Sequence, residues 1–196
     1  MKFGDGNMDF LQLVKERYAV RKFSDKKVER EKLDLILEAG RVAPTADNYQ
    51  PQRILVIDNE DSLTKLKSCT PYHFNAPLVL LVCYDSTVSW KRPYDKVDMG
   101  VVDASIVTTH MMLQVTNLGL GSTWVGHFNA DIIKKNLELP EYLVPVALLP
   151  IGYPRSDSAP HQLHGKRYDI NDTVFFNSFE GITQGKNDEG QNGLLK

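Results

Sequence analysis

The sequence is poor in cysteine, since Cys69 and Cys83 are the only two in 196 residues. Two cysteines this far apart form no CxxC redox pair and cannot supply a four-ligand zinc site. Cys83 lies in the apolar run 78–84, where a cysteine usually acts as a small buried hydrophobic residue. Disulfides and metals are also unnecessary for stability, because one domain of this length can bury roughly 70% of its unfolded surface.

Long apolar runs and an excess of one charge are missing as well. No run approaches the roughly 18 apolar residues that a transmembrane helix needs, and residues 1–6 contain no apolar core of a signal peptide. The 23 basic and 25 acidic residues give a net charge of −2, which argues against nucleic acid or an anionic membrane as a partner. We therefore expect a cytoplasmic protein that holds any anion with a few well-placed basic residues.

The motifs of several common enzyme sites are absent. Gly119, Gly121 and Gly126 miss the dinucleotide fingerprint because the third glycine comes two residues late. The sequence contains no GxSxG elbow and no HExxH pair. His161 and His164 are the only closely spaced histidines, and they lie in a polar stretch. We predict no metal site and no nucleophilic hydrolase.

What the sequence does contain is a mixture of helical and strand periodicities. They predict helices from residue 10 to about 18, from about 28 to before 44, and over 61–68, 98–118 and 130–139. They predict strands over 53–57, 78–84, 120–125 and 144–152, with a late candidate over 173–179. The fold class is therefore α+β, with four or five strands buried on both faces by helices. We expect one domain over residues 1–179 and a flexible, Gly- and Asn-rich tail over 180–196.

Two arginines at the end of the first helix form the first candidate site. Arg17 and Arg21 are four residues apart, so both guanidinium groups can converge on one point. Two forked donors of this kind suit a phosphate group. The alternative is a solvated basic helix end that only complements the helix dipole.

The second candidate site is the segment 44–51, which has a proline at each end and lies between a helix and a strand. The side-chain amides of Asn48 and Gln50 both donate and accept hydrogen bonds, so together they can bind the edge of a heterocycle. The alternative is an ordinary Asx-type turn.

In this order and spacing, the two segments resemble those of the FMN-dependent nitroreductase family. The family's first motif matches Arg17, Ala19, Arg21 and Phe23, and its second matches Pro44, Thr45, Asn48, Gln50 and Pro51. Residues 118–126 resemble its Leu-Gly-Leu-Gly-x-x-Trp-x-Gly segment, and residues 146–154 resemble its last core strand. Arg167, with Lys166 beside it, matches a basic residue near the family's C-terminus. The chain departs from the family at Ala19, Asp47 and Gln52, where serine, glycine and tryptophan are usual.

The resemblance implies a three-layer α/β/α fold with a mostly antiparallel central sheet. It also implies an FMN-dependent oxidoreductase that passes hydride from NADH or NADPH to a small conjugated acceptor, such as a nitroaromatic or a quinone, in ping-pong order. No dedicated catalytic acid or base is expected, because the cofactor performs the difficult step. Two alternatives are a flavin-binding or flavin-processing protein without nicotinamide turnover, and a non-enzymatic interaction domain.

The resemblance also assigns the site residues. It implies that Arg17, Arg21 and Arg167, with Lys166 nearby, hold the FMN phosphate, and that the backbone of Tyr18 and Ala19 follows the ribityl chain. It implies that the flavin edge is lined by Thr45, Ala46, Asn48 and Gln50, and that backbone N–H groups of Trp124, Val125 and Gly126 approach the ring. Apart from the resemblance, Trp90, Tyr94 and Phe128 are candidates for an aromatic lid over the flavin; the alternative is a plain surface loop with stray aromatic residues.

The resemblance finally implies a homodimer with two FMN sites at the subunit interface, each built from both chains. The long predicted helix 98–118 has an apolar face of small to medium residues, which suits packing against a partner helix. A central helix of a monomeric core would have an equally suitable pattern. Residues 173–179 are expected to cross to the partner as an added edge strand.

Overall fold

The computed structural model describes residues 9–182 of the chain. Residues 1–8 and 183–196 lie outside the described part, and with them most of the predicted tail. The chain divides into two compact units, Met1–His161 and Gln162–Lys196, and each is described by itself.

The first unit is built on a sheet of four strands in the order β1-β2-β4-β3, and every pair is antiparallel. The strands are β1 (Gln52–Ile57), β2 (Leu78–Asp85), β3 (Gly121–Ser122) and β4 (Leu143–Gly152). β2 is buried along its whole length, as its unbroken apolar sequence predicts for a central strand. The prediction of a mostly antiparallel sheet with four or five strands is confirmed.

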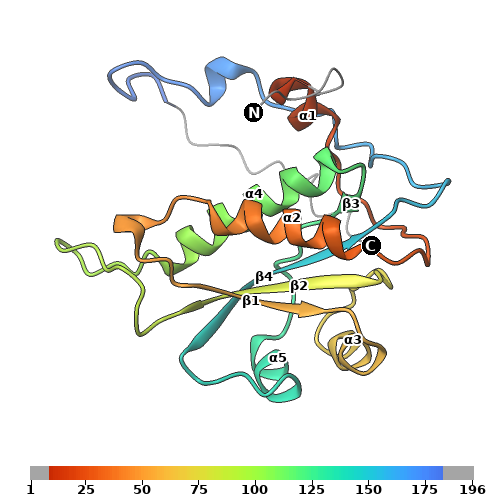
Figure 1. Ribbon diagram of the computed structural model, residues 1–196. Helices are drawn as coiled ribbons and strands as arrows, with labels where there is room; N and C mark the ends of the chain where they lie inside the picture. Colours follow the sequence, from red (N-terminus) through yellow and green to blue (C-terminus); the bar gives the residue numbers. More distant parts are fainter. Residues whose placement is uncertain (1–8, 183–196) are drawn as a thin grey trace. The chain divides into compact units, whose positions relative to one another are not determined.

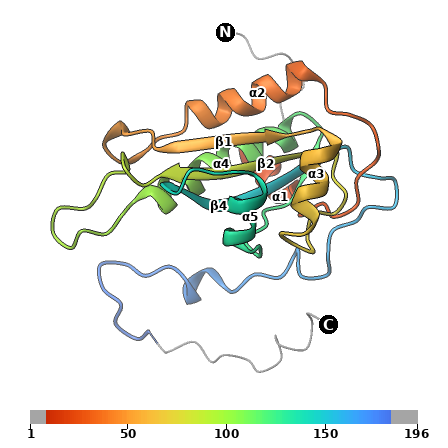
Figure 2. The same cartoon turned by 90° about the horizontal axis from the view of Figure 1, so that it is seen from below.

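Helices cover both faces of this sheet (Figures 1 and 2). The helices α2 (Arg30–Arg41) and α4 (Gly100–Asn117) lie on one face, while α3 (Glu60–Lys67) and α5 (Ala130–Asn136) lie on the other. Alternate residues of β2 serve the two sides: Leu80 and Val82 face α2 and α4, and Val79 and Leu81 join the opposite core. The three-layer α+β fold is confirmed.

The first helix is shorter than predicted. Helix α1 (Phe10–Glu16) ends before Tyr18, and the Asp9 side chain makes no capping hydrogen bond. Leu13 is the buried residue of this helix, whereas Phe10 is exposed. Residues 17–23 are therefore not a continuation of a helix, and this changes how the two arginines are presented.

Prolines explain the places where the observed strands depart from the predicted ones. The predicted strand 120–125 is regular only at Gly121–Ser122, although Val125 still pairs with Leu148 in the same register. Between them, Thr123 N–H donates to Pro150 O at 3.4 Å, and Pro150 has no N–H to return. Pro145 in β4 stands at a bulge opposite β2 for the same reason.

The second unit is described over residues 162–182 and contains one short 3-10 helix, Ile170–Asp172. The predicted strand 173–179 is wrong, because these residues form turns and bends. Asn177 has a φ of +65°, which breaks an extended path, and Phe175 and Phe179 contact each other edge to face at 5.4 Å. No strand of the described part of this unit offers a ladder on which residues 173–179 could become extended.

Candidate functional site

The segment that carries Arg17 and Arg21 runs beside β3 and the end of β4. Val20 N–H donates to Ser122 O at 3.0 Å, and Ala19 forms a parallel bridge with Ser122. Farther along, Ser24 N–H donates to Tyr153 O at 2.9 Å. Three of the sequence motifs, residues 17–23, 118–126 and 146–154, are thus brought together in one place.

Gly121 makes this close approach possible. A Cβ at this position would lie 2.5 Å from Val20 Cγ2, well inside van der Waals contact. A side chain here would therefore push the segment 17–23 away from β3. The glycine is required because the Val20 side chain occupies the space that a Cβ would need.

Arg17 and Arg21 lie on an extended chain. Their α-carbons are therefore separated by roughly 13 Å, instead of being one turn apart on a helix. Side chains alternate along an extended segment, so Arg17, Ala19 and Arg21 share the side opposite the buried Val20. Within residues 9–182, neither guanidinium has a hydrogen-bond or ion-pair partner. Two long, free cations flanking a small alanine form a donor set that fits an anionic group such as phosphate.

The neighbouring basic residues are different, because an acidic side chain neutralises them. Lys22 Nζ and Arg155 Nε both pair with Asp157, Lys22 at 3.0 Å. These partners strongly lower the pKa of Asp157, with Arg155 as the larger cause. Charge pairing therefore distinguishes Arg17 and Arg21 from the cations next to them.

The turn 124–126 is held by the sheet. Val125 N–H donates to Leu148 O at 2.9 Å, and Leu148 N–H returns a bond to Val125 O at 3.0 Å. The expectation that Val125 offers its own N–H to a ligand is therefore wrong in this structure. Trp124 is half-buried and Gly126 is exposed, so these two residues of the turn can still face a ligand.

The segment 44–51 forms a tight turn with an unusual backbone. Asp47, Asn48 and Gln50 have φ values of +49°, +56° and +50°, a region that non-glycine residues seldom adopt. Gln50 N–H donates to Thr45 Oγ1 at 3.1 Å, and Ala46 N–H donates to Asp103 Oδ1 at 2.8 Å. The Asn48 side chain is exposed at this turn and available to a ligand.

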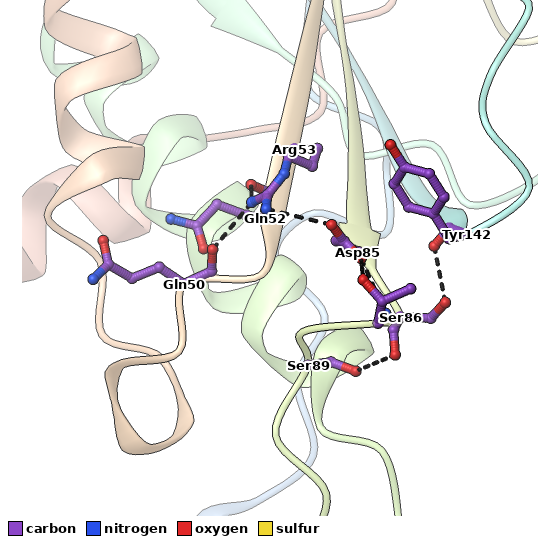
Figure 3. Close-up of polar contacts among 8 residues, drawn as sticks. Gln50, Gln52, Arg53, Asp85, Ser86, Ser89 and Tyr142 are labelled. Atoms are coloured by element: carbon purple, nitrogen blue, oxygen red, sulfur yellow. Dashed lines mark hydrogen bonds and ion pairs between the residues drawn. The ribbon is translucent and has the colours of Figure 1, made fainter.

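An arginine at the start of β1 ties the end of this turn to the sheet (Figure 3). Arg53 Nη1 donates to the carbonyl oxygens of Gln50 at 3.2 Å and Gln52 at 2.9 Å, and its Nη2 lies 3.4 Å from Asp85 Oδ2. The Thr87 hydroxyl lowers the pKa of the Asp85 carboxyl, burial opposes this, and Arg53 adds to the lowering. No sequence motif marks this contact.

The two predicted halves of the site lie at opposite ends of the α2–α4 pair. At one end, Lys32 Nζ donates to Leu118 O at 3.1 Å, next to the segments 17–23 and 118–126. At the other end, Ala46 contacts Asp103 in the first turn of α4. The 12 residues of α2 span about 18 Å between these ends. One chain therefore does not bring Arg17 and Arg21 to the turn that carries Asn48 and Gln50.

The predicted aromatic lid is also dispersed. Tyr94 is 96% exposed on the loop 86–99, and Trp90 is half-buried at the base of that loop. The loop is braced internally, because Trp90 O accepts from Met99 N–H and Arg92 N–H donates to Val97 O. Phe128 packs into the core on the α3–α5 side of the sheet. The three aromatics therefore do not converge within one chain.

Lys166 and Arg167 lie in the second unit. Arg167 Nη1 donates to the carbonyl oxygens of His164 and Lys166, both at 2.6 Å, so its guanidinium is engaged locally by its own loop.

The apolar face predicted for the long helix points away from the core. Val101 and Val102 of α4 are about half exposed, at 48% and 44%, and they line a shallow groove with Ser105, Ile106, Thr109 and His110. The buried face, which packs on α2 and the sheet, instead comprises Ala104, Val107, Thr108, Met111 and Val115, together with Asp103. Sequence periodicity did not identify Asp103 as a buried residue. The signal that could have identified it is an acidic residue in an otherwise apolar stripe of the helix.

Other chemistries find no support in the described residues. Within residues 9–182, no group of three or more His, Cys, Asp or Glu side chains could hold a metal ion. Burial raises the pKa of the Cys83 thiol to about 12, so it stays protonated and unreactive at neutral pH. None of the helices in the described part of the chain combines the length and the apolar character needed to cross a membrane.

Comparisons with known proteins agree on one family. The family model described as the nitroreductase family matches residues 14–70 and 71–153. A Methanothermobacter thermautotrophicus protein named as an NADH dehydrogenase/NAD(P)H nitroreductase is 31% identical over 80% of this chain and 83% of its own length. The FMN reductase [NAD(P)H] of Bacillus subtilis is 27% identical over 77% of this chain and 68% of its own.

Solved structures show the same similarity. A nitroreductase family protein from Clostridium difficile 630 has a TM-score of 0.82 at 41% identity, and covers 87% of this chain and 99% of that one. An FMN-dependent nitroreductase from C. difficile R20291 has a TM-score of 0.70 at 29% identity, over 86% and 99% of the two chains.

Proposed function

This chain belongs to the nitroreductase family, and we propose that it passes hydride from NAD(P)H through FMN to a small conjugated acceptor such as a nitroaromatic compound or a quinone. It is an NAD(P)H-dependent oxidoreductase with FMN as its cofactor, in keeping with relatives named for NAD(P)H nitroreductase and FMN reductase activity. When bound, FMN supplies the hydride-transfer chemistry. The chain's own residues bind and orient it.

The observation that carries this proposal is the pair of unpaired guanidinium groups beside β3. Arg17 and Arg21 share one side of an extended segment, whereas Lys22 is neutralised by Asp157. We propose that these two arginines hold the phosphate while the backbone of Tyr18 and Ala19 follows the ribityl chain.

We propose that the turn 44–51 lines the edge of the flavin ring. Thr45 and Ala46 shape this wall, and the amides of Asn48 and Gln50 read the alternating carbonyl and N–H groups of the ring. We propose that Trp124 and Gly126 contact the face of the ring. The backbone hydrogen bonds between Val125 and Leu148 hold both residues on the sheet.

The spatial separation of these two groups supports a homodimer in which each flavin site takes one group from each chain. An exposed apolar face on α4 supports the same arrangement, because monomers rarely leave a contiguous apolar surface uncovered. We propose that α4 packs on the α4 of a second copy, so that Asn48 and Gln50 reach the partner's flavin.

The acceptor pocket is proposed to form from aromatic residues of both chains. Tyr94 is free to reach a neighbouring molecule because it lies on a braced, protruding loop. With Trp90 and Phe128, it would present flat apolar surfaces to a planar acceptor, which suits nitroaromatics and quinones. NAD(P)H and the acceptor would occupy this pocket in turn, which gives ping-pong kinetics. We also propose a cytoplasmic setting, which the two free, buried cysteines support.

Anaerobic half-reactions test the proposed function. We expect purified protein to bind FMN, to lose the yellow flavin absorbance on addition of NADH or NADPH, and to regain it when nucleotide-free reduced protein meets a quinone or nitroaromatic. Absence of FMN binding would contradict the proposal. Binding without bleaching by either nucleotide would favour a flavin-binding protein without turnover, and reoxidation that requires bound nucleotide would contradict ping-pong order.

A further inference from the structure

We propose that Asp103 is a positioning residue for the flavin site, because its hydrogen bond to Ala46 fixes the turn 44–51 on helix α4. The inference rests on the proposed function of that turn, which carries Asn48 and Gln50. Asp103 itself is not expected to touch FMN, because its side chain is almost fully buried in the chain.

The burial of this carboxylate is the first observation. Asp103 is 1% exposed on the face of α4 that packs on the sheet, among Ala104, Val107 and Met111. Its Oδ1 accepts Ala46 N–H at 2.8 Å, while its Oδ2 is buried and has no hydrogen-bond partner within the described residues. An unpaired buried oxygen costs stability, and an apolar side chain would avoid that cost. The bond to Ala46 is the contact that such a replacement would lose.

The strained backbone of the turn is the second, independent observation. Three non-glycine residues, Asp47, Asn48 and Gln50, have positive φ values within four positions. Conformations of this kind persist only where the surrounding contacts determine them. Such contacts fix both ends of this turn, so Asn48 and Gln50 are presented in one arrangement.

The contacts of the turn come from different parts of the fold. Gln50 is held by Thr45 from within the turn and by Arg53 from the sheet. Asp103 is the contact from the helical layer. Gln52 Oε1, at the other end of the turn, is a second buried oxygen without a partner within the described residues. The polar side chains beneath the turn therefore hold it in place, although the two unpartnered oxygens lower the stability of the fold.

The consequence is a link between α4 and the flavin edge. Asp103 belongs to the buried face of α4, whereas Val102 and Ile106 belong to the exposed groove on the same helix. A change in the position of α4 against a second copy would therefore also act on the turn through the hydrogen bond between Ala46 and Asp103. Losing this bond should loosen the turn without removing any group that contacts FMN.

Three variants test this role. Asp103→Ala removes the acceptor, and Asp103→Asn keeps one oxygen that can accept from Ala46. Thr108→Val is the matched control, since Thr108 is equally buried on the same face and its hydroxyl bonds only to Ala104 O of its own helix at 2.7 Å. The readouts are amide hydrogen exchange of Ala46 in the FMN-free protein, and FMN affinity from quenching of flavin fluorescence.

We expect Asp103→Ala to speed exchange at Ala46 and to raise the FMN Kd, each by about tenfold or more, as loss of a charge-assisted hydrogen bond predicts. Asp103→Asn should keep both values near those of the wild type, and Thr108→Val should lower the melting temperature without changing either. If Asp103→Ala fails to fold, Asp103→Val removes the same acceptor while filling more of the buried space, and we expect the same faster exchange at Ala46 and the same rise in Kd.

Several results would overturn the inference. They are wild-type FMN affinity and amide protection in Asp103→Ala, an equal loss in Asp103→Asn, or an equal rise in Kd in Thr108→Val. Failure of the wild-type protein to bind FMN would instead contradict the proposed function, and exchange at Ala46 would still report whether Asp103 fixes the turn.

Discussion

Individual residues decide which charges of this chain remain available to a ligand. Lys22 and Arg155, two cations near the candidate site, are neutralised by Asp157. Arg17 and Arg21 are not paired within the described residues. Sequence spacing singled out these two arginines, and it placed them where the first helix gives way to a loop. Their extended backbone could not be predicted, because it depends on the pairing of Ala19 and Val20 with Ser122.

Arg21→Ala should weaken FMN binding. Loss of a charge-assisted contact predicts a penalty of roughly 1.5–3 kcal/mol, or about a 10- to 100-fold higher Kd, measured by fluorescence titration. Lys22→Ala is the matched control, because it removes the same charge one residue later from a side chain already paired with Asp157. An unchanged titration for Arg21→Ala, or equal losses in both variants, would rule out the phosphate assignment.

A second residue-scale prediction concerns pH. A hydrogen bond from Tyr153, followed by one from Lys26, lowers the pKa of Glu29 from its ordinary value of 4.5 to about 2. A lowered carboxyl pKa contributes stability above the unfolded-state value, and this stability is lost as pH falls from about 4.5 towards 2. Tyr153→Phe should therefore lower the melting temperature at neutral pH, with a difference that shrinks below pH 4. A difference that stays constant with pH would show that the Glu29 carboxylate is not involved.

Among the elements, the strands and the long helix show which features of the fold the sequence patterns predict. The cores of β1, β2, β4 and α4 were predicted within two residues, because their apolar periodicity is strong. The strand at 120–125 is interrupted because Pro150 lies opposite Thr123 across the sheet, a tertiary pairing that local sequence does not reveal. The sequence pattern identified the apolar face of α4, but it did not show whether that face packs into the core or points outward. Only the packed structure shows that it points outward, while Asp103 points into the core.

Gly121→Ala tests the contact between β3 and the segment 17–23. The added Cβ would lie 2.5 Å from Val20, so we expect a loss of roughly 1–3 kcal/mol in the free energy of unfolding, measured with urea, together with weaker FMN binding. Gly126→Ala is the control for stability, since a Cβ there meets nothing within 4 Å, and it should change the unfolding free energy by less than about 0.5 kcal/mol. Equal stability of the two variants would contradict the proposed packing.

At the scale of the whole molecule, the proposed site needs more than one chain. The segment with Arg17 and Arg21 lies at one end of α2, and the turn with Asn48 and Gln50 follows its other end. The sequence motifs named both groups, but linear order could not show that about 18 Å of helix separates them. The outward apolar face of α4 supplies a surface through which a second copy could complete each site.

Val102→Asp should dissociate the proposed dimer. Val102 is 44% exposed, so the charge should leave the fold of each chain intact while making the α4 contact unfavourable. We expect the mass from light scattering to fall to that of one chain, and FMN binding to be lost with it. Ile132→Asp on α5 is the control on the opposite side of the sheet, and it should remain dimeric. A Val102→Asp protein that stays dimeric and retains FMN would contradict the proposed interface.

Complementation between two defective chains tests most directly whether the site is shared. One chain would carry Arg17→Ala with Arg21→Ala, the other Asn48→Ala with Gln50→Ala, and each homodimer should bind FMN poorly. In a mixed dimer isolated with two affinity tags, both defects fall in one site and the other site contains only native residues. The shared-site account predicts one tightly bound FMN per mixed dimer, with wild-type affinity. No tight binding in the mixed dimer would show that both groups of residues act within a single chain, and would contradict the account.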